Sequence, residues 1–220
     1  MSNVVIFGSG QQAEVAHFYL TADSPHNVIA FAVDREYLKE TTFFGLPVVP
    51  FEEVEVRYPP ETTKMFVAVG YSGLNSLRRD KYDAAKAKGY ELITYVSSGT
   101  SLRANPKIGD NCFILEDITI QPYVEIGNNV TIWSGNHLGH HCRIKDNVFI
   151  TSHVVISGGT EIGENCFLGV NSTFRDHIKV GARCLVGAGA LILQDCEDDG
   201  LYPGVSTPRA SIPSSRIKRI

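Results

Sequence analysis

The chain has 220 residues, of which 43% are hydrophobic and 20% charged, and its formal net charge is −4 at pH 7. A chain of this size can bury one or two cores, and its acidic balance provides no basic field to attract nucleic acid. No apolar stretch reaches the roughly 18 to 20 residues of a membrane-spanning helix, so we expect no membrane partner either. The opening segment MSNVVIFGSG has the pattern of a first strand rather than of a signal peptide, which predicts a soluble cytoplasmic protein.

The first elements along the chain predict an α/β domain. Four short apolar runs have the length of buried strands: residues 4–7, 28–33, 65–69 and 92–96. Helix-forming residues follow the first run from Gln11 onward, and the segment SGLNSLRRDKYDAAKAKG follows the third run with a glycine stop. Strands that alternate with helices favour a parallel sheet with crossover helices, a Rossmann-like arrangement.

Ligands of parallel sheets bind at the carboxyl ends of the strands. In this chain those ends carry Gly8, Ser9, Gly10, Asp34, Arg35 and Gly70. The glycine turn resembles a dinucleotide-binding fingerprint whose third glycine is replaced by Ala13, and Asp34 stands where a ribose-binding acid would be. Backbone N–H groups at such a helix start suit a phosphate. An ordinary turn glycine and a solvated acid explain the same residues equally well.

The second half of the chain is a repeat. From Ile108 to Ile192 a large apolar residue recurs at every sixth position without interruption. The position two before each apolar anchor is mostly small or β-branched, and the position three after it is mostly Asn, Asp or Gly, which tolerate positive φ and so mark corners. This hexapeptide pattern is typical of a left-handed parallel β-helix, in which three repeats form one triangular coil. Residues three repeats apart therefore lie directly above one another.

The cysteines follow the same period. Their spacings are all multiples of six, which places them in the small inward row: Cys112, Cys142, Cys166, Cys184 and Cys196. A thiol in that row packs as a small hydrophobic group. We therefore expect interior packing rather than disulfides or metal ligands.

The densest group of ionisable residues on the repeat surrounds His140 and His141. His141 falls in the corner row, where a histidine can serve the backbone conformation alone. His140 stands one position earlier, where no structural rule requires a ring, and Gly158 lies three repeats further on. An exposed imidazole beside an accessible backbone N–H is the minimum for acyl transfer, because the base takes the proton of the nucleophile and the amide holds the oxyanion.

Several motifs carry a resemblance over nearly the whole chain: FGSGQQ, VDRE, AVG, GHHC, ENCFLGVNS and GLYPGVSTPR. With them the chain resembles the bacterial nucleotide-sugar acetyltransferases of the left-handed β-helix superfamily, which act on perosamine and bacillosamine precursors, and the related sialic acid O-acetyltransferase. The resemblance implies an acetyl-CoA-dependent homotrimer of surface-glycan biosynthesis, with no metal, whose acceptor is a nucleotide-linked amino sugar. We expect a nucleotide-binding α/β domain at 1–97, the β-helix acyltransferase domain at 98–205 and a tail at 206–220.

The resemblance also implies roles for individual residues. His140 matches the general base, with His141 beside it where an acidic residue is common, and Gly158 matches the oxyanion donor. The expected coenzyme-binding residues are Phe149, Gly158, Val170 and Ala188. The expected nucleotide-binding residues are Gly8, Gly10, Gln11, Gln12, Asp34, Arg35 and Gly70. Phe149 departs from the pattern, since some members of the family place a coenzyme-contacting histidine there.

Alternative functions stay open at this point. The acceptor could be a sugar hydroxyl, and the acyl group could be longer than acetyl. A zinc enzyme of the γ-carbonic-anhydrase type would use His141 and His177, but the third ligand position holds Ala182. An NAD-dependent enzyme or a nucleotide sensor would depend on the GSGQQA turn alone.

Overall fold

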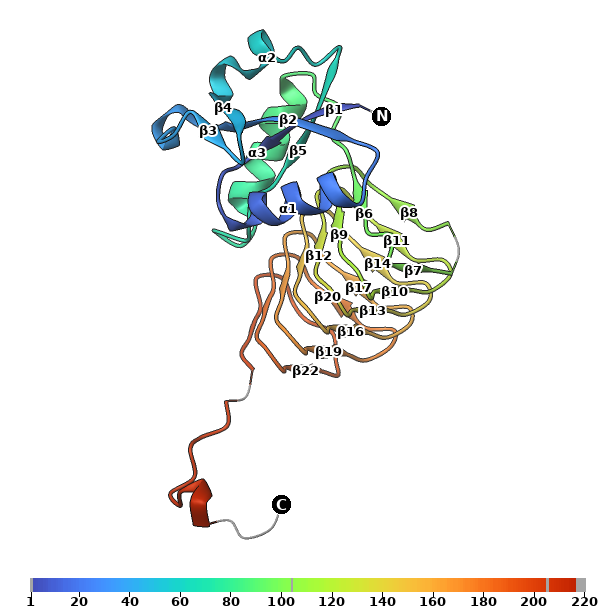
Figure 1. Ribbon diagram of the computed structural model, residues 1–220. Coiled ribbons are helices and arrows are strands. Elements are labelled where there is room, and N and C mark those ends of the chain that lie inside the picture. Colours follow the sequence, from blue (N-terminus) through green and yellow to red (C-terminus); the bar gives the residue numbers. More distant parts are fainter. Residues whose placement is uncertain (1, 104, 205, 217–220) are drawn as a thin grey trace.

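The computed structural model describes residues 2–103, 105–204 and 206–216. Val205 and residues 217–220, which include the end of the expected solenoid segment and part of the expected tail, lie outside these described residues. An α/β domain sits against a long coiled solenoid, and the C-terminal segment extends away from the last coil (Figure 1). In the described ranges no helix combines the length and the apolar character needed to cross a membrane.

The α/β domain is built on a five-stranded sheet of order β3-β4-β2-β1-β5, parallel except for the β3–β4 pair. Helix α1 packs on one face of this sheet and α3 on the other, in two separate apolar clusters. The elements are β1 (Asn3–Phe7), α1 (Gln11–Ala22), β2 (Asn27–Val33), β3 (Thr42–Phe43), β4 (Leu46–Pro50), α2 (Val54–Arg57), β5 (Thr63–Val67) and α3 (Ser76–Ala87).

Two details differ from the sequence-based expectation for this domain. The run 92–96 is not a fourth strand of the sheet, because Leu92 makes only an isolated bridge to Met65 while the end of the run pairs with the solenoid. This run connects the two halves of the molecule, so its apolar residues are divided between two cores. Strand β4 was not predicted, since its two valines lie between prolines, which usually interrupt strands.

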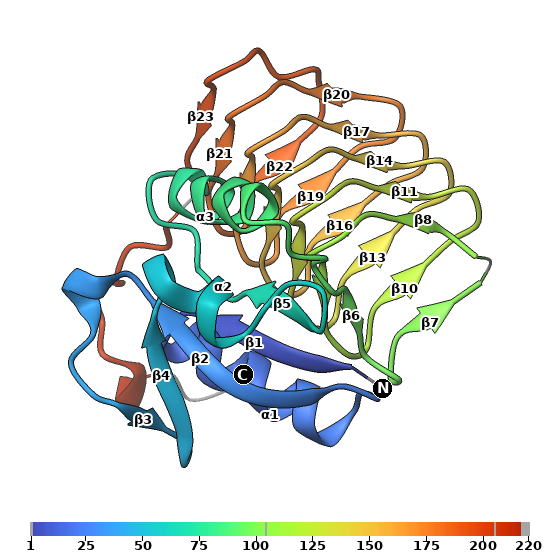
Figure 2. The same ribbon diagram turned by 90° about the horizontal axis from the view of Figure 1, so that it is seen from above.

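The solenoid consists of two-residue strands stacked in three parallel sheets, which we call the first, second and third faces in chain order (Figure 2). The first face contains β6 (Tyr95–Val96), β9 (Phe113–Ile114), β12 (Thr131–Ile132), β15 (Phe149–Ile150), β18 (Phe167–Leu168), β21 (Leu185–Val186) and β23 (Leu201–Tyr202). The second contains β7 (Ser101–Leu102), β10 (Thr119–Ile120), β13 (His137–Leu138), β16 (Val155–Ile156), β19 (Thr173–Phe174) and β22 (Leu191–Ile192). The third contains β8 (Lys107–Ile108), β11 (Glu125–Ile126), β14 (Arg143–Ile144), β17 (Glu161–Ile162) and β20 (Lys179–Val180).

The interior of the solenoid confirms the hexapeptide register. The apolar anchors and all five cysteines form one continuous buried core, except that the first anchor, Ile108, is only partly buried, and the cysteines are free thiols. Burial raises the pKa of the Cys112 and Cys166 thiols to about 12. The predicted corner positions adopt positive φ, among them Asn111, His141 and Gly159. The six-residue spacing therefore identified both the inward rows and the turns.

The outward rows distinguish the three faces. On the first face the outward residues are apolar apart from Thr131, and Phe113 joins the core of the α/β domain. On the third face they alternate in charge: Lys107, Glu125, Arg143, Glu161 and Lys179. On the second face they carry no acid, lysine or arginine: Ser101, Thr119, His137, Val155, Thr173 and Leu191. Among the described residues, the α/β domain covers the first face as far as its middle strands, where Phe113 and Phe149 are buried, whereas Leu185 and Leu201 further along are exposed.

The α/β domain is fixed to the solenoid at the corner between the third and first faces. Arg78 of α3 is 1% exposed, and its Nη2 donates to the carbonyl of Asn147 at 2.8 Å. Nδ2 of Asn75 donates to the carbonyl of Cys166 at 3.0 Å, and the amide of Asn111 pairs with both backbone groups of Val67 in β5. These contacts hold the carboxyl end of β5 and the start of α3 against the coils.

Candidate active site

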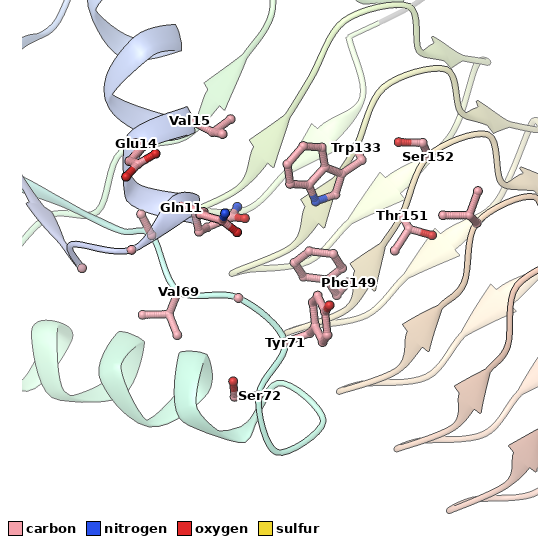
Figure 3. Close-up of a pocket in the computed structure, with 16 residues that line it drawn as sticks. Gln11, Glu14, Val15, Val69, Tyr71, Ser72, Trp133, Phe149, Thr151 and Ser152 are labelled. Atoms are coloured by element: carbon pink, nitrogen blue, oxygen red, sulfur yellow. The ribbon is translucent and has the colours of Figure 1, made fainter.

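A cavity of about 910 Å³ opens between the glycine turn of the α/β domain and the corner that joins the first and second faces (Figure 3). The α/β domain contributes the predicted residues Gly8, Gly10, Gln11, Gln12 and Gly70. The solenoid contributes Trp133, Phe149, Thr151, Ser152 and Val170. The structure thus brings most of the predicted nucleotide-binding residues together around one space.

The glycines of this cavity have different structural needs. Gly8 has a φ of +122°, and a Cβ atom there would lie 2.7 Å from the carbonyl oxygen of Ala68, so the fold requires glycine. Gly10 has a φ of −97°, and a Cβ atom there would meet nothing within 4 Å. The fold therefore does not require glycine at position 10. Gly10 lines the cavity, and a side chain there would enter open space.

The start of α1 leaves backbone donors beside the cavity. The carbonyl of Gly10 accepts the N–H groups of Ala13 and Glu14, at 2.8 and 3.1 Å. Among the described residues, no backbone hydrogen bond uses the N–H of Gln11 or Gln12. Unused N–H groups at the N-terminus of a twelve-residue helix suit an anionic group such as phosphate.

Aromatic side chains form the wall that faces these donors. The ring of Tyr71 packs on Phe149 and Phe167, with centroid distances of 5.1 and 4.9 Å. Phe149 is 2% exposed because Tyr71 packs on it, so a ligand can contact little of the Phe149 ring. No pattern in the sequence predicted Tyr71 or Trp133, although Trp133 is the only tryptophan and directly follows a repeat anchor.

A second cavity, of about 460 Å³, continues on the other side of the glycine turn and shares Gly8 and Gly10 with the first. Here Oδ1 of Asp34 accepts a hydrogen bond from Nζ of Lys81 at 2.6 Å. Arg35 does not line this cavity, because its guanidinium is paired with Glu53. Of the predicted nucleotide-binding residues, Asp34 therefore lines the second cavity, whereas Arg35 lines neither cavity.

The corner between the second and third faces holds the predicted catalytic group. The His140 ring lies over Gly158, where an added Cβ atom would be 2.6 Å from Cε1 and 2.7 Å from Nε2. The N–H of Gly158 makes no hydrogen bond among the described residues, whereas the matching N–H of His140 donates to Oε1 of Gln121 at 2.9 Å. The three-repeat register predicted this juxtaposition of an imidazole and a free backbone donor.

His141 is the partner of the His140 ring. The two Nδ1 atoms are 3.1 Å apart, so one ring must donate a proton and the other must accept it. His141 has a φ of +59°, and its ring packs on Tyr123 with a centroid distance of 4.7 Å. A neutral His141 that accepts from Nδ1–H of His140 leaves Nε2 of His140 as a free proton acceptor.

The histidine corner and the large cavity are on different corners of the same coil. The cavity adjoins Ser152 and Val170, after strands of the first face, and Ala188 follows three repeats after Val170. His140 comes after β13 of the second face and precedes β14 of the third. The second face therefore separates the two sites within one chain. Across residues 2–103, 105–204 and 206–216, no three His, Cys, Asp or Glu side chains are grouped as metal ligands.

Comparisons with known proteins agree with the repeat. The family pattern described as "Bacterial transferase hexapeptide (six repeats)" matches residues 105–140, 123–158 and 159–194. No curated protein sequence matches the chain.

Solved structures extend the similarity to both halves. The acetyltransferase domain of PglB from Neisseria gonorrhoeae is 25% identical, with a TM-score of 0.81 over 91% of this chain and 96% of that one. PerB from Caulobacter crescentus, in complex with CoA and GDP-perosamine, is also 25% identical, with a TM-score of 0.81 over 91% and 93%. The repeat match in the second half and the similarity of both halves to these two solved structures support an acyltransferase. The solenoid of this acyltransferase fits a left-handed β-helix. WeeI from Acinetobacter baumannii is 19% identical and has the same fold, with a TM-score of 0.76 over 93% of this chain and 97% of that one.

Proposed function

We propose that this acyltransferase moves the acetyl group of acetyl-CoA to the amino group of a nucleotide-linked 4-amino-4,6-dideoxy sugar, in surface-glycan biosynthesis. The observation that carries the proposal is the His140 ring over Gly158, whose N–H is unused among the described residues. The similarity to PerB, which was crystallised with CoA and GDP-perosamine, supports the choice of substrates. Residues 1–97 act as a Rossmann-like nucleotide-binding domain and residues 98–205 as the transferase domain.

The proposed reaction is a direct transfer. The amine attacks the thioester carbonyl while Nε2 of His140 accepts an amine proton, and the N–H of Gly158 donates to the oxyanion. Collapse of the tetrahedral intermediate breaks the C–S bond, and the proton held by His140 passes to the departing CoA thiolate. In this proposal Nδ1 of His141, 3.1 Å from Nδ1 of His140, accepts the proton on that atom and so fixes the His140 tautomer. Val170 and Ala188 contribute to the coenzyme site in this proposal.

The active unit in this proposal is a homotrimer. Within one chain the cavity and His140 lie on opposite sides of the second face, so a single chain cannot bring one substrate to both. The outward row of the second face has no acid, lysine or arginine, which favours burial against another copy. The third face instead carries a charged ladder, such as Lys107 with Glu125 at 3.2 Å, that remains solvated. A trimer packed through the second face places one chain's His140 beside the cavity of its neighbour.

Thiol release tests the proposed reaction. Purified protein and acetyl-CoA are mixed with UDP-, GDP- and dTDP-linked 4-amino sugars, and with the same sugars bearing a 4-hydroxyl. We expect release with one nucleotide class and far slower release with the hydroxyl sugars. Activity on sialic acid without activity on any amino sugar would favour an O-acetyltransferase instead. Light scattering tests the trimer, which a monomer at micromolar concentration would contradict.

A further inference from the structure

The two cavities meet at the glycine turn, and their positions orient a nucleotide sugar. This inference rests on the function proposed above. The larger cavity adjoins the corner between the first and second faces, beside which the proposed trimer places the His140 of a neighbouring chain, so it takes the sugar. The free N–H groups of Gln11 and Gln12 at the turn take the diphosphate. The smaller cavity, which shares Gly8 and Gly10 with the larger one, is then left for the base.

The smaller cavity presents a fixed pair of hydrogen-bonding groups. Asp34 and Lys81 are 19% and 22% exposed, and their ion pair spans 2.6 Å. The Lys81 ammonium also lies 5.5 Å from the centroid of the Phe7 ring, which restricts its position further. Among the described residues, Oδ2 of Asp34 makes no hydrogen bond. A base entering this cavity therefore meets an acceptor beside a donor, with Tyr37 and Leu77 among the lining residues.

We propose that the Asp34–Lys81 pair selects guanine as the base of the nucleotide sugar. The guanine edge has one acceptor, O6, followed by two donors, N1–H and N2–H. Lys81 donates to O6, and the carboxylate of Asp34 accepts from N1–H and N2–H, so every group on that edge is paired.

The other bases leave an unfavourable contact in the same site. Uracil and thymine have one N–H between two carbonyl oxygens, so a second carbonyl would face the Asp34 carboxylate. Adenine and cytosine present a ring nitrogen acceptor in place of N1–H, which also faces that carboxylate. A site built to hydrogen-bond a donor discriminates strongly against a ligand that lacks it, because the polar group is left unpaired.

Calorimetric titration of the full chain with nucleoside diphosphates tests the base preference. We expect GDP to bind at least about tenfold more tightly than UDP, dTDP or ADP. IDP, which lacks only the N2 amine, should bind several-fold more weakly than GDP. Equal or tighter binding of UDP or dTDP would overturn the guanine assignment and leave the proposed reaction intact. Binding of none of these nucleotides would overturn the nucleotide assignment itself, and guanine selection with it.

A matched pair of lysines tests the role of Lys81. Lys88 also pairs with a carboxylate, Glu55, is 21% exposed and lies 5.1 Å from the centroid of Phe51, but it lines neither cavity. Lys81→Met should lower the affinity for GDP about tenfold, whereas Lys88→Met should leave it unchanged. An equal loss of GDP and UDP affinity in Lys81→Met would show that the lysine supports the cavity without reading the base.

Asp34→Asn tests the assignment by shifting the base preference from guanine toward xanthine. The amide replaces one acceptor with a donor, which suits the O2 carbonyl of xanthine and opposes the N2 amine of guanine. The ratio of xanthosine diphosphate to GDP affinity should therefore rise at least about tenfold relative to wild type. Because the ratio is measured on one protein, a change in the folded fraction does not alter it. An unchanged ratio would overturn the assignment.

Discussion

Two corners of the same triangular coil have different surfaces. The corner between the first and second faces presents Trp133, Ser152 and Val170 to a cavity shared with the α/β domain. The corner between the second and third faces presents an imidazole, His140, over the bare backbone of Gly158. The inward rows and the corner backbone are alike at both places, so the repeat supplies positions and the outward residues supply the chemistry. Because the proposed recognition and reaction sites occupy separate corners, mutations should affect the two functions separately.

The largest expected effect is at the histidine corner. His140→Asn should lower kcat by about 10²- to 10⁴-fold with little change in KM for acetyl-CoA, because the base acts on the proton transfer and not on coenzyme binding. Steady-state kinetics with a fixed amino sugar measures both constants. If His141→Asn were the inactive variant and His140→Asn retained activity, His141 would be the base instead.

The second face provides the next test, since in the proposed trimer the two corners cooperate between neighbouring chains. Val155 is 38% exposed and lies in the outward row of the second face. Val155→Arg should dissociate the proposed trimer, because the new charge would be buried in the interface without a partner. Light scattering should report monomers, and specific activity should fall by more than about tenfold at low protein concentration. Glu161→Arg, on the charged third face, is the control and should remain trimeric. A trimeric Val155→Arg variant would show that the second face is not the interface.

At the cavity corner, the two turn glycines should respond in opposite ways. Gly10→Ala should leave the melting temperature unchanged and weaken nucleotide binding about tenfold, since the new methyl group points into space left for the ligand. Gly8→Ala should lower stability by about 1–3 kcal/mol, because position 8 combines a φ of +122° with close contact to Ala68. Thermal melts and calorimetry separate the two effects. Tight nucleotide binding by Gly10→Ala would contradict the proposed diphosphate position.

The smallest effect is expected for the helper ring. His141→Asn should lower kcat only several-fold, since Asn tolerates positive φ and keeps a polar group beside His140. Steady-state kinetics with the same amino sugar measures the change in kcat. A loss as large as that of His140→Asn would contradict the helper role of His141.

The sequence predicted the parts of the molecule that follow a repeat or a local pattern. The register of three repeats placed His140 over Gly158, and the helix starting at Gln11 followed from the glycine turn. Lys81 and Tyr71 were not predicted, because they reach the cavities only through the packing of α3 and of the segment after β5 against other elements. The same limit applies to Leu92, whose apolar side chain gives no sign of which core it joins. Contacts within the coil are periodic, whereas contacts between the halves depend on three-dimensional packing.

The contacts of Asn111, Arg78 and Asn75 with the corner of the solenoid also restrict how its length can change. They involve the corners at residues 111, 147 and 165, so the number of coils between these corners must match the spacing of the contacting residues in the α/β domain. A coil inserted or deleted between these corners would shift one anchoring point by about 4.8 Å relative to the others. At the next corner, the Arg183 side chain pairs with Asp198 and Asp199 of the final turn and, among the described residues, makes no ion pair with the α/β domain. Insertion or loss of whole coils is therefore compatible with this architecture only at the C-terminal end, beyond the reach of α3.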